Sequence, residues 1–349
     1  MAVPSGEHEA VLNILSPVAG GSGVEVLHRS LAQGIPGYRV TRYSPLWSLF
    51  PPALVGFSSK KVSLVHASAD YGVFFKRHGV PLVATIHNYT SDRFMRAFSS
   101  RLQYLHYRSD LRLFTRLTLQ TASAVVAISR FMADKVRDDL QVSRPIRLIY
   151  NGIDEQRFLP PRNRRQSQRF RVLFCGNLNR RKRADLLGPL AHALGKGFEL
   201  QFTAGLSDTS HTAANRGTDA ADMRPLGRVA YADMPMVYAD ADVLFMPSVR
   251  EGFGLCVAEA MASGLPVIAC VESAIPELVV DQQGGYLCPI DDVACYAKAI
   301  RTLAGSAERA RLMGEYNRAR VEERFTLARM VHEYRELFTE VADNARDLQ

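Results

Sequence analysis

The sequence lacks the features that mark several large classes of protein. None of its 349 residues lies in an apolar run of roughly 18 or more, so we expect no membrane-spanning helix. The start, MAVPSGEHEAVLNIL, has no basic stretch followed by a long apolar core, and we expect no signal peptide. The five cysteines are widely spaced and form no Cys-x-x-Cys pair: Cys175, Cys256, Cys270, Cys288 and Cys295. This argues against a zinc cluster and a disulfide framework, and it fits a reducing cytosol.

Several ligand-binding motifs are missing as well. The dinucleotide fingerprint GxGxxG fails, because Val26 stands at the third glycine position after Gly21 and Gly23. The phosphate-binding pattern GxxxxGK followed by Ser or Thr does not occur. No Asp-x-Asp or histidine cluster is placed to bind a metal. We therefore expect neither a metal nor a resident cofactor.

Positive charge is in excess. Lys and Arg number 43 against 35 Asp and Glu, which gives a net charge of +8 and a pI near 9.3. A basic protein of this kind suits a phosphorylated ligand, an acidic membrane surface or nucleic acid. Nucleic acid is disfavoured, because the basic residues are not interleaved with stacking aromatics. The charge is also consistent with an ordinary basic cytosolic protein.

Short β-branched segments alternate with longer helical stretches along the whole chain. We predict strands at 11–15, 38–43, 62–66, 82–86, 124–128 and 146–149 in the first half, and at 171–175, 199–203, 242–246, 266–270 and 285–287 in the second. Strand, helix and strand in series predict parallel sheets with helices on both faces. The fold class is therefore α/β, with two Rossmann-like doubly wound domains facing each other across a cleft.

The domain boundaries follow from composition. The polar, Arg-rich segment PPRNRRQSQRF (160–170) is typical of a linker. We predict an N-terminal domain at 1–158, a linker at 159–170, a C-terminal domain at 171–325 and a helical segment at 326–349 that packs back on the N-terminal domain. Ligands of doubly wound sheets bind at the carboxyl ends of the strands. Candidate chemistry is therefore expected directly after strands.

Two candidate segments follow strands of the first domain. In SPVAGGSGVEVLHRSLA (16–32), glycines such as Gly20 and Gly21 let the backbone approach a phosphate at the start of a helix. The same residues are equally suited to a tight strand-to-helix turn. In PLVATIHNY (81–89), His87 ends a buried strand, where an imidazole can orient a sugar hydroxyl or assist proton transfer. A lone histidine is more often structural.

A cationic segment follows the first strand of the second domain. FCGNLNRRKRADLL (174–187) turns at a glycine and places four cations before a helix: Arg180, Arg181, Lys182 and Arg183. Cations packed at the carboxyl end of a strand suit a diphosphate. A solvated helix start is the alternative, although cations have the unfavourable sign for the amino end of a helix.

The segment REGFGLCVAEAMASGLPVIAC (250–270) holds two glutamates separated by seven residues. Gly252 and Gly254 free backbone N–H groups to meet a phosphate at a helix start. Glu259, one turn into that helix, would point back toward the same anion, and its two oxygens match the vicinal diol of a ribose. Glu251 would then face the sugar end of a nucleoside diphosphate sugar. Two solvated acids remain the alternative.

Together these segments resemble the retaining family-4 glycosyltransferases of the GT-B fold. The most specific is EGFGLCVAEAMASGLPVIA (251–269), which looks like the family's block of two glutamates with seven residues between them. GGSGVE, TIHN, VAISRFMADKV, LIYNGID, ADVLFMPS and GGYLCP follow in the family's order, so the resemblance covers nearly the whole chain.

The resemblance implies roles for single residues. Gly20 and Gly21 would approach the donor phosphates, and His87 would lie on the acceptor side of the donor sugar. Lys182 matches the family's phosphate-binding lysine, and Glu251 would contact hydroxyls of the transferred sugar. Backbone N–H groups of Phe253, Gly254 and Leu255 would face the diphosphate, Glu259 would hold the ribose, and the base would lie against the backbone near Val229. Asn177 stands where the family often has arginine, and Arg181 is our candidate for the missing cation.

The reaction implied is transfer of a hexose from a nucleotide-diphosphate sugar to a hydroxyl of a glycan or lipid-linked acceptor. Configuration would be retained, without a metal, in cell-envelope polysaccharide or glycolipid synthesis. Two alternatives stay open: a nonhydrolysing sugar-nucleotide epimerase and a non-catalytic sugar-nucleotide-binding protein of the same fold.

Two segments suggest a membrane surface as a further partner. YSPLWSLFPPALVGF (43–57) holds the only tryptophan and is followed by Lys60 and Lys61, and 93–116 carries six arginines among apolar residues. They predict docking on anionic lipid, on the cytoplasmic face of a membrane. Ordinary elements of the N-terminal domain are the alternative.

Overall fold

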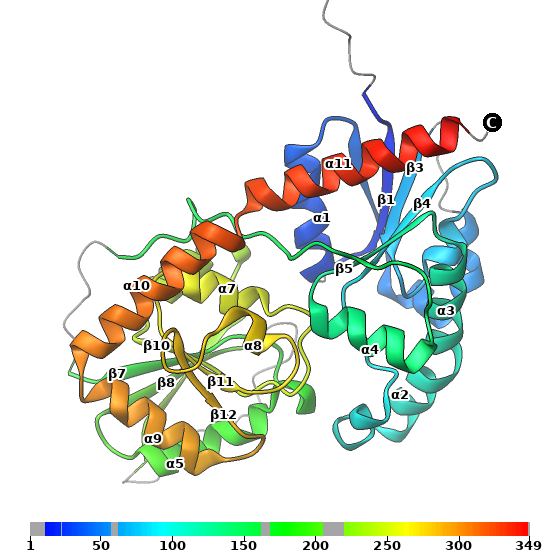
Figure 1. Ribbon diagram of the computed structural model, residues 1–349. Coiled ribbons are helices and arrows are strands. Elements are labelled where there is room, and N and C mark those ends of the chain that lie inside the picture. Colours follow the sequence, from blue (N-terminus) through cyan, green and yellow to red (C-terminus); the bar gives the residue numbers. More distant parts are fainter. Residues whose placement is uncertain (1–10, 22, 57–61, 162–167, 205–219, 348–349) are drawn as a thin grey trace, which may run out of the picture.

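The computed structural model describes residues 11–21, 23–56, 62–161, 168–204 and 220–347. These residues form two α/β domains, each built on a parallel six-stranded sheet. Figure 1 shows the two sheets in separate bodies, with helices on both faces of each. The predicted fold class is thereby confirmed. Within the described ranges, no helix combines the length and the apolar character needed to cross a bilayer.

The N-terminal sheet has the strand order β2-β1-β3-β4-β5-β6. Its strands are β1 (Ile14–Ala19), β2 (Tyr38–Tyr43), β3 (Leu64–Ser68), β4 (Leu82–Ile86), β5 (Ala124–Ala127) and β6 (Arg147–Leu148). Its helices are α1 (Gly23–Gly34), α2 (Arg101–His106), α3 (Arg112–Thr121) and α4 (Arg130–Leu140), and a π-helical turn, η5 (Tyr107–Leu111), joins α2 to α3. The 3-10 turns η1 (Pro45–Leu49), η2 (Pro51–Gly56), η3 (Gly72–Phe75) and η4 (Arg93–Phe98) lie in the connections.

The C-terminal sheet has the order β12-β11-β10-β7-β8-β9. Its strands are β7 (Phe170–Phe174), β8 (Phe198–Thr203), β9 (Asp222–Gly227), β10 (Val243–Met246), β11 (Val267–Cys270) and β12 (Gly285–Cys288). The helices are α5 (Leu187–Leu194), α6 (Met234–Ala239), α7 (Leu255–Ala262), α8 (Ile275–Leu278), α9 (Val293–Ala304) and α10 (Ala307–Arg324). The 3-10 turns η6 (Arg180–Lys182), η7 (Ala184–Leu186) and η8 (Tyr231–Asp233) complete it.

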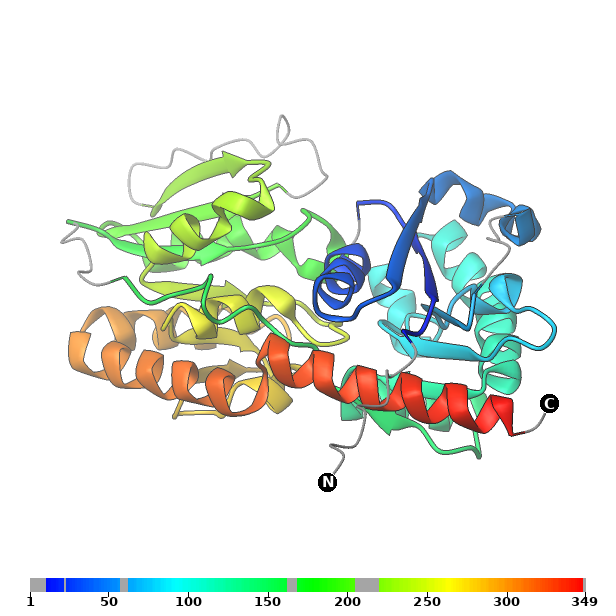
Figure 2. The ribbon, with the colours of Figure 1, turned by 90° about the horizontal axis from the view of Figure 1, so that it is seen from above.

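The last helix, α11 (Leu327–Arg346), belongs in space to the other domain. Figure 2 shows α10 along the C-terminal domain and α11 along the N-terminal domain, nearly end to end. Met330, Tyr334 and Leu337 of α11 join the buried cluster that also holds Ile14 of β1 and Leu64 of β3. Half of the linker predicted at 159–170, residues 162–167, lies outside the described residues.

One prediction about the cysteines is wrong. Cys288, at the end of β12, and Cys295, in the first turn of α9, form a disulfide. A strand and the helix that follows it bring their Cα atoms to 5.9 Å, within the range that a disulfide spans, although no Cys-x-x-Cys motif is present. The inference from cysteine spacing to a reducing compartment is therefore withdrawn.

Candidate functional site

The C-terminal sheet changes direction between its neighbouring strands β7 and β10. β8 and β9 follow on one side of this pair, and β11 and β12 follow on the other. In a doubly wound sheet, such a switch point leaves the loops after the two strands free to bind a ligand at the carboxyl edge. The loop after β7 carries Arg181 and Lys182, and the loop after β10 carries Glu251, so three predicted site residues meet here.

Lys182 and Glu251 form a buried ion pair. The Nζ atom of Lys182 lies 2.7 Å from Oε1 of Glu251, and about nine-tenths of each side chain is shielded from solvent. The hydroxyl of Ser248 donates to the same carboxylate oxygen. Burial by itself raises the pKa of Glu251, but Lys182 and Arg181 outweigh it and lower the pKa to about 2. Glu251 is therefore ionised at neutral pH. It can accept hydrogen bonds from hydroxyl groups, but it is poorly suited to carry a proton.

Arg181 ties the two loops together. Its Nη1 atom lies 3.2 Å from Oε1 of Glu251 and also donates to the backbone carbonyl of Arg250. Its own carbonyl accepts from the N–H of Val249 at 3.1 Å. The second cation that we expected near Lys182 is thus held at the same carboxylate. Asn177, in the family's arginine position, starts the turn through its carbonyl, which accepts from the N–H of Asn179.

The glycine turn after Glu251 leads directly into α7. Gly254 has a φ of +100°, which L residues with a Cβ rarely adopt, and its carbonyl accepts from the N–H groups of Val257 and Ala258. Phe253 is buried and packs against Tyr150 and Phe325. Its side chain fixes the turn, so the amino end of α7 from Leu255 onward is directed at the switch point, where an anion is stabilised.

Glu259 lies in a different environment from Glu251. Its Oε2 atom accepts from the hydroxyl of Tyr238 at 2.7 Å, and the carboxyl is buried. Burial raises the pKa of Glu259 to about 7, although Tyr238, Arg157 and Tyr231 act in the opposite direction. Arg157 stacks over the ring of Tyr231 at 4.5 Å. Val229, our candidate for the base side, is half-buried between β9 and this tyrosine.

The glycine loop of the N-terminal domain faces the same region. A Cβ on Gly23 would lie 3.6 Å from Leu255, so the amino ends of α1 and α7 meet between the domains. The N–H of Gly20 donates to the carbonyl of Tyr43 at 3.1 Å, and that of Gly21 donates to Oε2 of Glu25 at 2.7 Å. Both N–H groups therefore already have acceptors within the protein. A phosphate close to these glycines would contact their Cα atoms. Ser22 lies outside the described residues.

His87 follows β4 and also lies at the domain contact. A Cβ on Gly252 would overlap its backbone carbonyl oxygen. The imidazole is largely buried, and its Nε2 atom lies 3.1 Å from Nε2 of His28. Burial lowers the pKa of His87 to about 3, so the ring is neutral at physiological pH.

Sequence reasoning missed Arg250. Its side chain is 2% exposed, and Nη2 donates to Oδ2 of Asp92 at 2.6 Å across the domain contact. The rings of Phe94 and Phe131 lie 4.8 and 5.0 Å from it. Asp92 stands 158 positions away in the chain, and nothing in the sequence links the two. The motif REGFG shows an arginine directly before the glutamate, but it does not reveal the carboxylate that this arginine binds.

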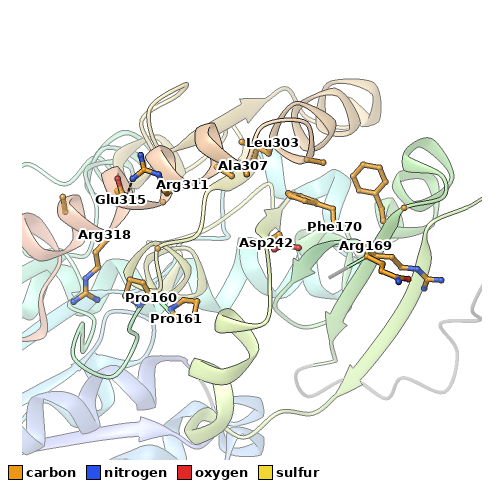
Figure 3. Close-up of a pocket in the computed structure, with 18 of the residues that line it drawn as sticks. Pro160, Pro161, Arg169, Phe170, Asp242, Leu303, Ala307, Arg311, Glu315 and Arg318 are labelled. Atoms are coloured by element: carbon orange, nitrogen blue, oxygen red, sulfur yellow. Dashed lines mark hydrogen bonds and ion pairs between the residues drawn. The ribbon is translucent and has the colours of Figure 1, made fainter. Parts of the chain in front are cut away.

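A pocket of about 1000 Å³ in the same domain does not belong to this site. Figure 3 shows it lined by Phe170, Asp242, Arg311 and Glu315, among others. Phe170 starts β7 and Asp242 precedes β10, so the pocket lies at the amino ends of the strands, opposite the switch point. Arg311 is paired with Glu308 and Glu315.

The sequence does contain one Asp-x-Asp triplet, Asp240-Ala241-Asp242, at this remote end. Asp240 pairs with the guanidinium of Arg171, and Oδ2 of Asp242 accepts from its backbone N–H at 2.7 Å. Both carboxylates therefore have a structural role in the described part of the chain.

Comparison with known proteins agrees with this geometry. Residues 14–157 match the family described as "Glycosyltransferase Family 4", and residues 169–306 match the family described as "Glycosyl transferases group 1". The two matches together take in both domains. Sulfoquinovosyl transferase SQD2 of Arabidopsis thaliana is 26% identical over 302 residues, which make up 79% of this chain and 56% of that protein. The chain thus spans little more than half the length of this curated relative.

Solved structures show the same arrangement of domains. Sucrose-phosphate synthase from Thermosynechococcus elongatus is similar with a TM-score of 0.80 at 20% identity, over 94% of this chain and 98% of that one. HepE from Anabaena, solved in complex with UDP-glucose, is similar with a TM-score of 0.77 at 20% identity, over 94% of this chain and 100% of that one. These likenesses establish a common fold.

Proposed function

Because the chain belongs to the family-4 glycosyltransferases of the GT-B fold, we propose that it transfers a hexose from a nucleoside-diphosphate sugar to a hydroxyl of a glycan or lipid-linked acceptor. The observation that carries the proposal is the buried pair of Lys182 and Glu251 at the switch point between β7 and β10. HepE was solved with UDP-glucose, and this supports a nucleoside-diphosphate sugar as the donor. Cell-envelope polysaccharide or glycolipid synthesis is the process that we propose for the product.

The proposed donor lies across the amino end of α7. Its diphosphate meets the N–H groups of the first turn and the ammonium of Lys182, and its ribose meets Glu259. The hydroxyl of Tyr238 donates to Oε2 of Glu259. In this proposal, the other oxygen of the carboxylate accepts from the ribose diol. The hexose then lies between Glu251 of one domain and His87 of the other.

The proposed reaction retains the anomeric configuration and uses no metal. The bond between the anomeric carbon and the diphosphate breaks, and its electron pair passes to the departing phosphate oxygen. The acceptor hydroxyl attacks the same face of the sugar and loses its proton to the departing diphosphate. Lys182 stabilises the negative charge that grows on that diphosphate, and the ionised Glu251 holds sugar hydroxyls and favours the cationic sugar.

A binding and turnover screen tests the proposal. Purified protein is titrated with UDP-, GDP- and ADP-sugars by calorimetry, and sugar release and transfer are followed by product analysis. We expect one nucleotide to bind tightly and its sugar to appear on an acceptor with the configuration retained. Conversion of the sugar nucleotide into its epimer without an acceptor would establish the epimerase alternative instead.

Asn177 favours a second candidate, a protein of this fold that binds a sugar nucleotide without transferring the sugar. It removes one cation from the diphosphate side relative to the family's usual arginine, and Arg181 is committed to Glu251. Tight nucleotide binding with no transfer to any acceptor would establish this candidate.

We also propose an anionic membrane surface as a partner of the N-terminal domain. Leu46, Phe50, Leu102 and Leu105 are exposed, and the exposed arginines nearby are Arg93, Arg96, Arg101 and Arg116. η2 in the first segment and α3 at the end of the second both contact η3, so the two segments approach each other there. Apolar side chains beside cations suit the headgroup region of anionic lipid, on the cytoplasmic side. Lys60 and Lys61 lie outside the described residues.

Sedimentation with vesicles tests this surface. Anionic vesicles should carry the protein down at low salt, and neutral vesicles should not. Leu102→Ser with Leu105→Ser should weaken the binding, whereas Leu312→Ser, an exposed leucine on α10 of the other domain, serves as the control. Equal binding to neutral and anionic vesicles would rule out the proposed docking.

A further inference from the structure

Behind His87, a line of hydrogen-bonding side chains crosses the interior of the N-terminal domain. We call it the buried polar chain; its members are His28, Tyr38, His66, Thr85 and Tyr334. Starting from Nε2 of His87, the links are His28 Nε2 at 3.1 Å, then His28 Nδ1 to the Tyr38 hydroxyl at 2.7 Å, Tyr38 to His66 Nδ1 at 2.6 Å, His66 Nε2 to Thr85 at 2.8 Å, and Thr85 to the Tyr334 hydroxyl at 3.2 Å.

The chain joins elements that are far apart in sequence. His28 lies on α1, and Tyr38, His66 and Thr85 lie on β2, β3 and β4. Tyr334 lies on α11, the helix that crosses from the C-terminal domain. All members are buried, four of them completely and Tyr38 at 5% exposure. A buried polar group without a partner costs roughly 1–3 kcal/mol, so each member needs its neighbours.

A metal does not explain the histidines. Among the described residues, no group of His, Cys, Asp and Glu side chains is arranged to hold a metal ion. The hydrogen bonds along the chain satisfy the imidazoles instead. Ser16 adds a branch, because its hydroxyl lies 2.6 Å from Nδ1 of His28.

The proton count along the chain restricts its states. Burial lowers the pKa of His28 and of His66 well below the usual value, and the neighbouring imidazoles, which cannot all be protonated together, lower both further. These rings are therefore neutral, as is His87. A neutral imidazole donates from one nitrogen and accepts at the other. Where two neutral rings meet through their Nε2 atoms, one must carry the proton and the other must not.

The direction of this first hydrogen bond sets the direction of the next one along the chain. If His28 donates from Nε2, its Nδ1 accepts, so Tyr38 donates to it and accepts from His66, and Thr85 and Tyr334 follow in the same direction. If His87 donates instead, every link reverses. Apart from the branch at Ser16, whose hydroxyl can serve Nδ1 of His28 in place of Tyr38, one neutral tautomer of His87 therefore goes with one direction of the chain, and a switch of tautomer reorients its members.

We propose that His28 is a positioning residue for His87, and that the buried polar chain behind it, ending at Tyr334 on α11, couples the tautomer of His87 to the direction of its hydrogen bonds and leaves only the Nδ1 atom of His87 for a ligand. The part that concerns transfer rests on the proposed function, because His87 is there the residue on the acceptor side of the donor sugar. The part that concerns the tautomer stands on the protein alone.

Nitrogen–proton correlation spectra of isotope-labelled histidine side chains, recorded on the protein without ligand, test the tautomer. We expect His87, His28 and His66 each in a single neutral tautomer at neutral pH. Tyr334→Phe removes only the last hydroxyl of the chain, and it should shift the resonances of His66 and change or mix the tautomer of His87. Tyr296→Phe is the control, because it removes a completely buried hydroxyl from the other domain.

Kinetics test the consequence. His28→Phe should lower kcat roughly ten- to a hundredfold, the range found when a metal-binding histidine loses the group that orients it, with little change in the KM for the donor. His28→Gln keeps one hydrogen bond to His87 and should recover part of the loss. Tyr334→Phe should lower kcat less than His28→Phe does, because it removes the most distant hydroxyl of the chain.

The outcomes separate the two levels of the proposal. An unchanged His87 tautomer in both Tyr334→Phe and His28→Phe would overturn it. If His28→Phe does not fold, Tyr334→Phe alone decides. Altered tautomers in a protein that transfers no sugar to any acceptor would leave the positioning inference standing and refute the proposed function.

Discussion

Glu251 and Glu259 belong to one short segment, yet their surroundings favour opposite charge states. Two cations hold Glu251 ionised, whereas burial against Tyr238 favours the neutral form of Glu259. A carboxyl held at a low pKa stabilises the fold above its unfolded pKa and loses that contribution as the pH falls toward about 2. A carboxyl with a raised pKa stabilises the fold below its unfolded value, and that contribution is lost as the pH rises through about 7.

The two glutamates should therefore affect stability with opposite dependence on pH. We compare the free energy of unfolding of the wild type with that of Glu251→Gln and of Glu259→Gln, by urea titration between about pH 3 and pH 8. The destabilisation caused by Glu251→Gln should shrink as the pH falls below the ordinary carboxyl range. Glu259→Gln should gain stability relative to the wild type as the pH rises toward 8. Parallel curves for the two variants would contradict the assigned surroundings.

Glu259→Gln also tests the ribose contact. A diol clamp serves the ground state and the transition state alike, so the KM for the donor and the Kd for free nucleoside diphosphate should rise, with kcat nearly unchanged. Calorimetry with the nucleotide measures the Kd directly. An unaltered nucleotide affinity would remove Glu259 from the donor site, and a lowered melting temperature without ligand would identify a structural role.

Lys182 should act mainly on turnover. The departing diphosphate gains charge as the sugar leaves, so a cation aimed at it is more valuable in the transition state. Lys182→Ala should lower kcat by roughly ten- to a thousandfold. Arg181→Ala should add a further loss, Asn177→Arg should restore part of it, and Arg180→Ala, at an exposed neighbouring arginine, should change little. If neither Lys182→Ala nor Arg181→Ala affects transfer, this loop does not bind the diphosphate.

Residues of the buried polar chain show where sequence reasoning stops. His66 and Thr85 interrupt apolar runs in β3 and β4, and that interruption is a visible signal of a buried partner. The identity of the partner is not visible, because His28, Tyr38 and Tyr334 come from elements separated by long stretches of chain. The sequence likewise does not show that Lys182 and Glu251 form an ion pair, although the motif around each residue identifies it as a candidate site residue.

At the scale of elements, the strand pattern was readable wherever strands are buried on both sides. β9, Asp222–Gly227, was missed because none of its residues is buried and it contains Pro225 and a glycine, which are unusual in strands. β1 begins three residues later than expected and runs through Pro17. The proline is tolerated because β3 pairs with β1 only at Ile14 and Leu15, so one side of the strand is free at Pro17.

The turn between β10 and α7 gives a prediction at this scale. Gly252 lies so close to the carbonyl of His87 that a Cβ would overlap it, and both groups are backbone and cannot yield easily. Gly252→Ala should therefore separate the two turns, lower the melting temperature and reduce transfer even at saturating donor. Gly188→Ala is the matched control: a Cβ there meets nothing within 4 Å, and alanine in helix α5 should be neutral or stabilising. Equal behaviour of the two variants would show that the turns are not held in contact.

At the scale of the whole molecule, the two domains are fastened by a buried pair, Arg250 and Asp92. Arg250 enters the N-terminal domain between Phe94 and Phe131 and binds a carboxylate there. Nearby, the carboxylate of Glu277 on α8 accepts from the first N–H groups of α4, those of Arg130 and Phe131. The amino end of a helix in one domain is thus capped by an acid from the other, which favours a closed arrangement.

Loss of one partner should open the molecule. Asp92→Ala leaves the guanidinium buried without its carboxylate, a change that costs roughly 3–5 kcal/mol when a pair is fully enclosed. We expect a larger radius of gyration in small-angle scattering and a lower melting temperature. Arg250→Met should open it less, because Lys135 lies 3.9 Å from Oδ2 of Asp92 and still offsets part of the charge of that carboxylate. Asp134→Ala, which breaks an exposed pair with Arg137 on α4, should leave both measurements unchanged. An unchanged radius of gyration in Asp92→Ala would show that the pair does not hold the domains together.

The crossing of α11 also determines when the first domain is finished. Its core joins Ile14, Leu64 and Val83 to Met330 and Leu337, so strands made early wait for a helix made near the end. A ribosome adds roughly 5–20 residues per second, and the delay between β6 and α11 is on the order of ten seconds or more. Throughout that interval the nascent sheet exposes the apolar face that α11 will cover. The domain that is translated first is the domain that is completed last.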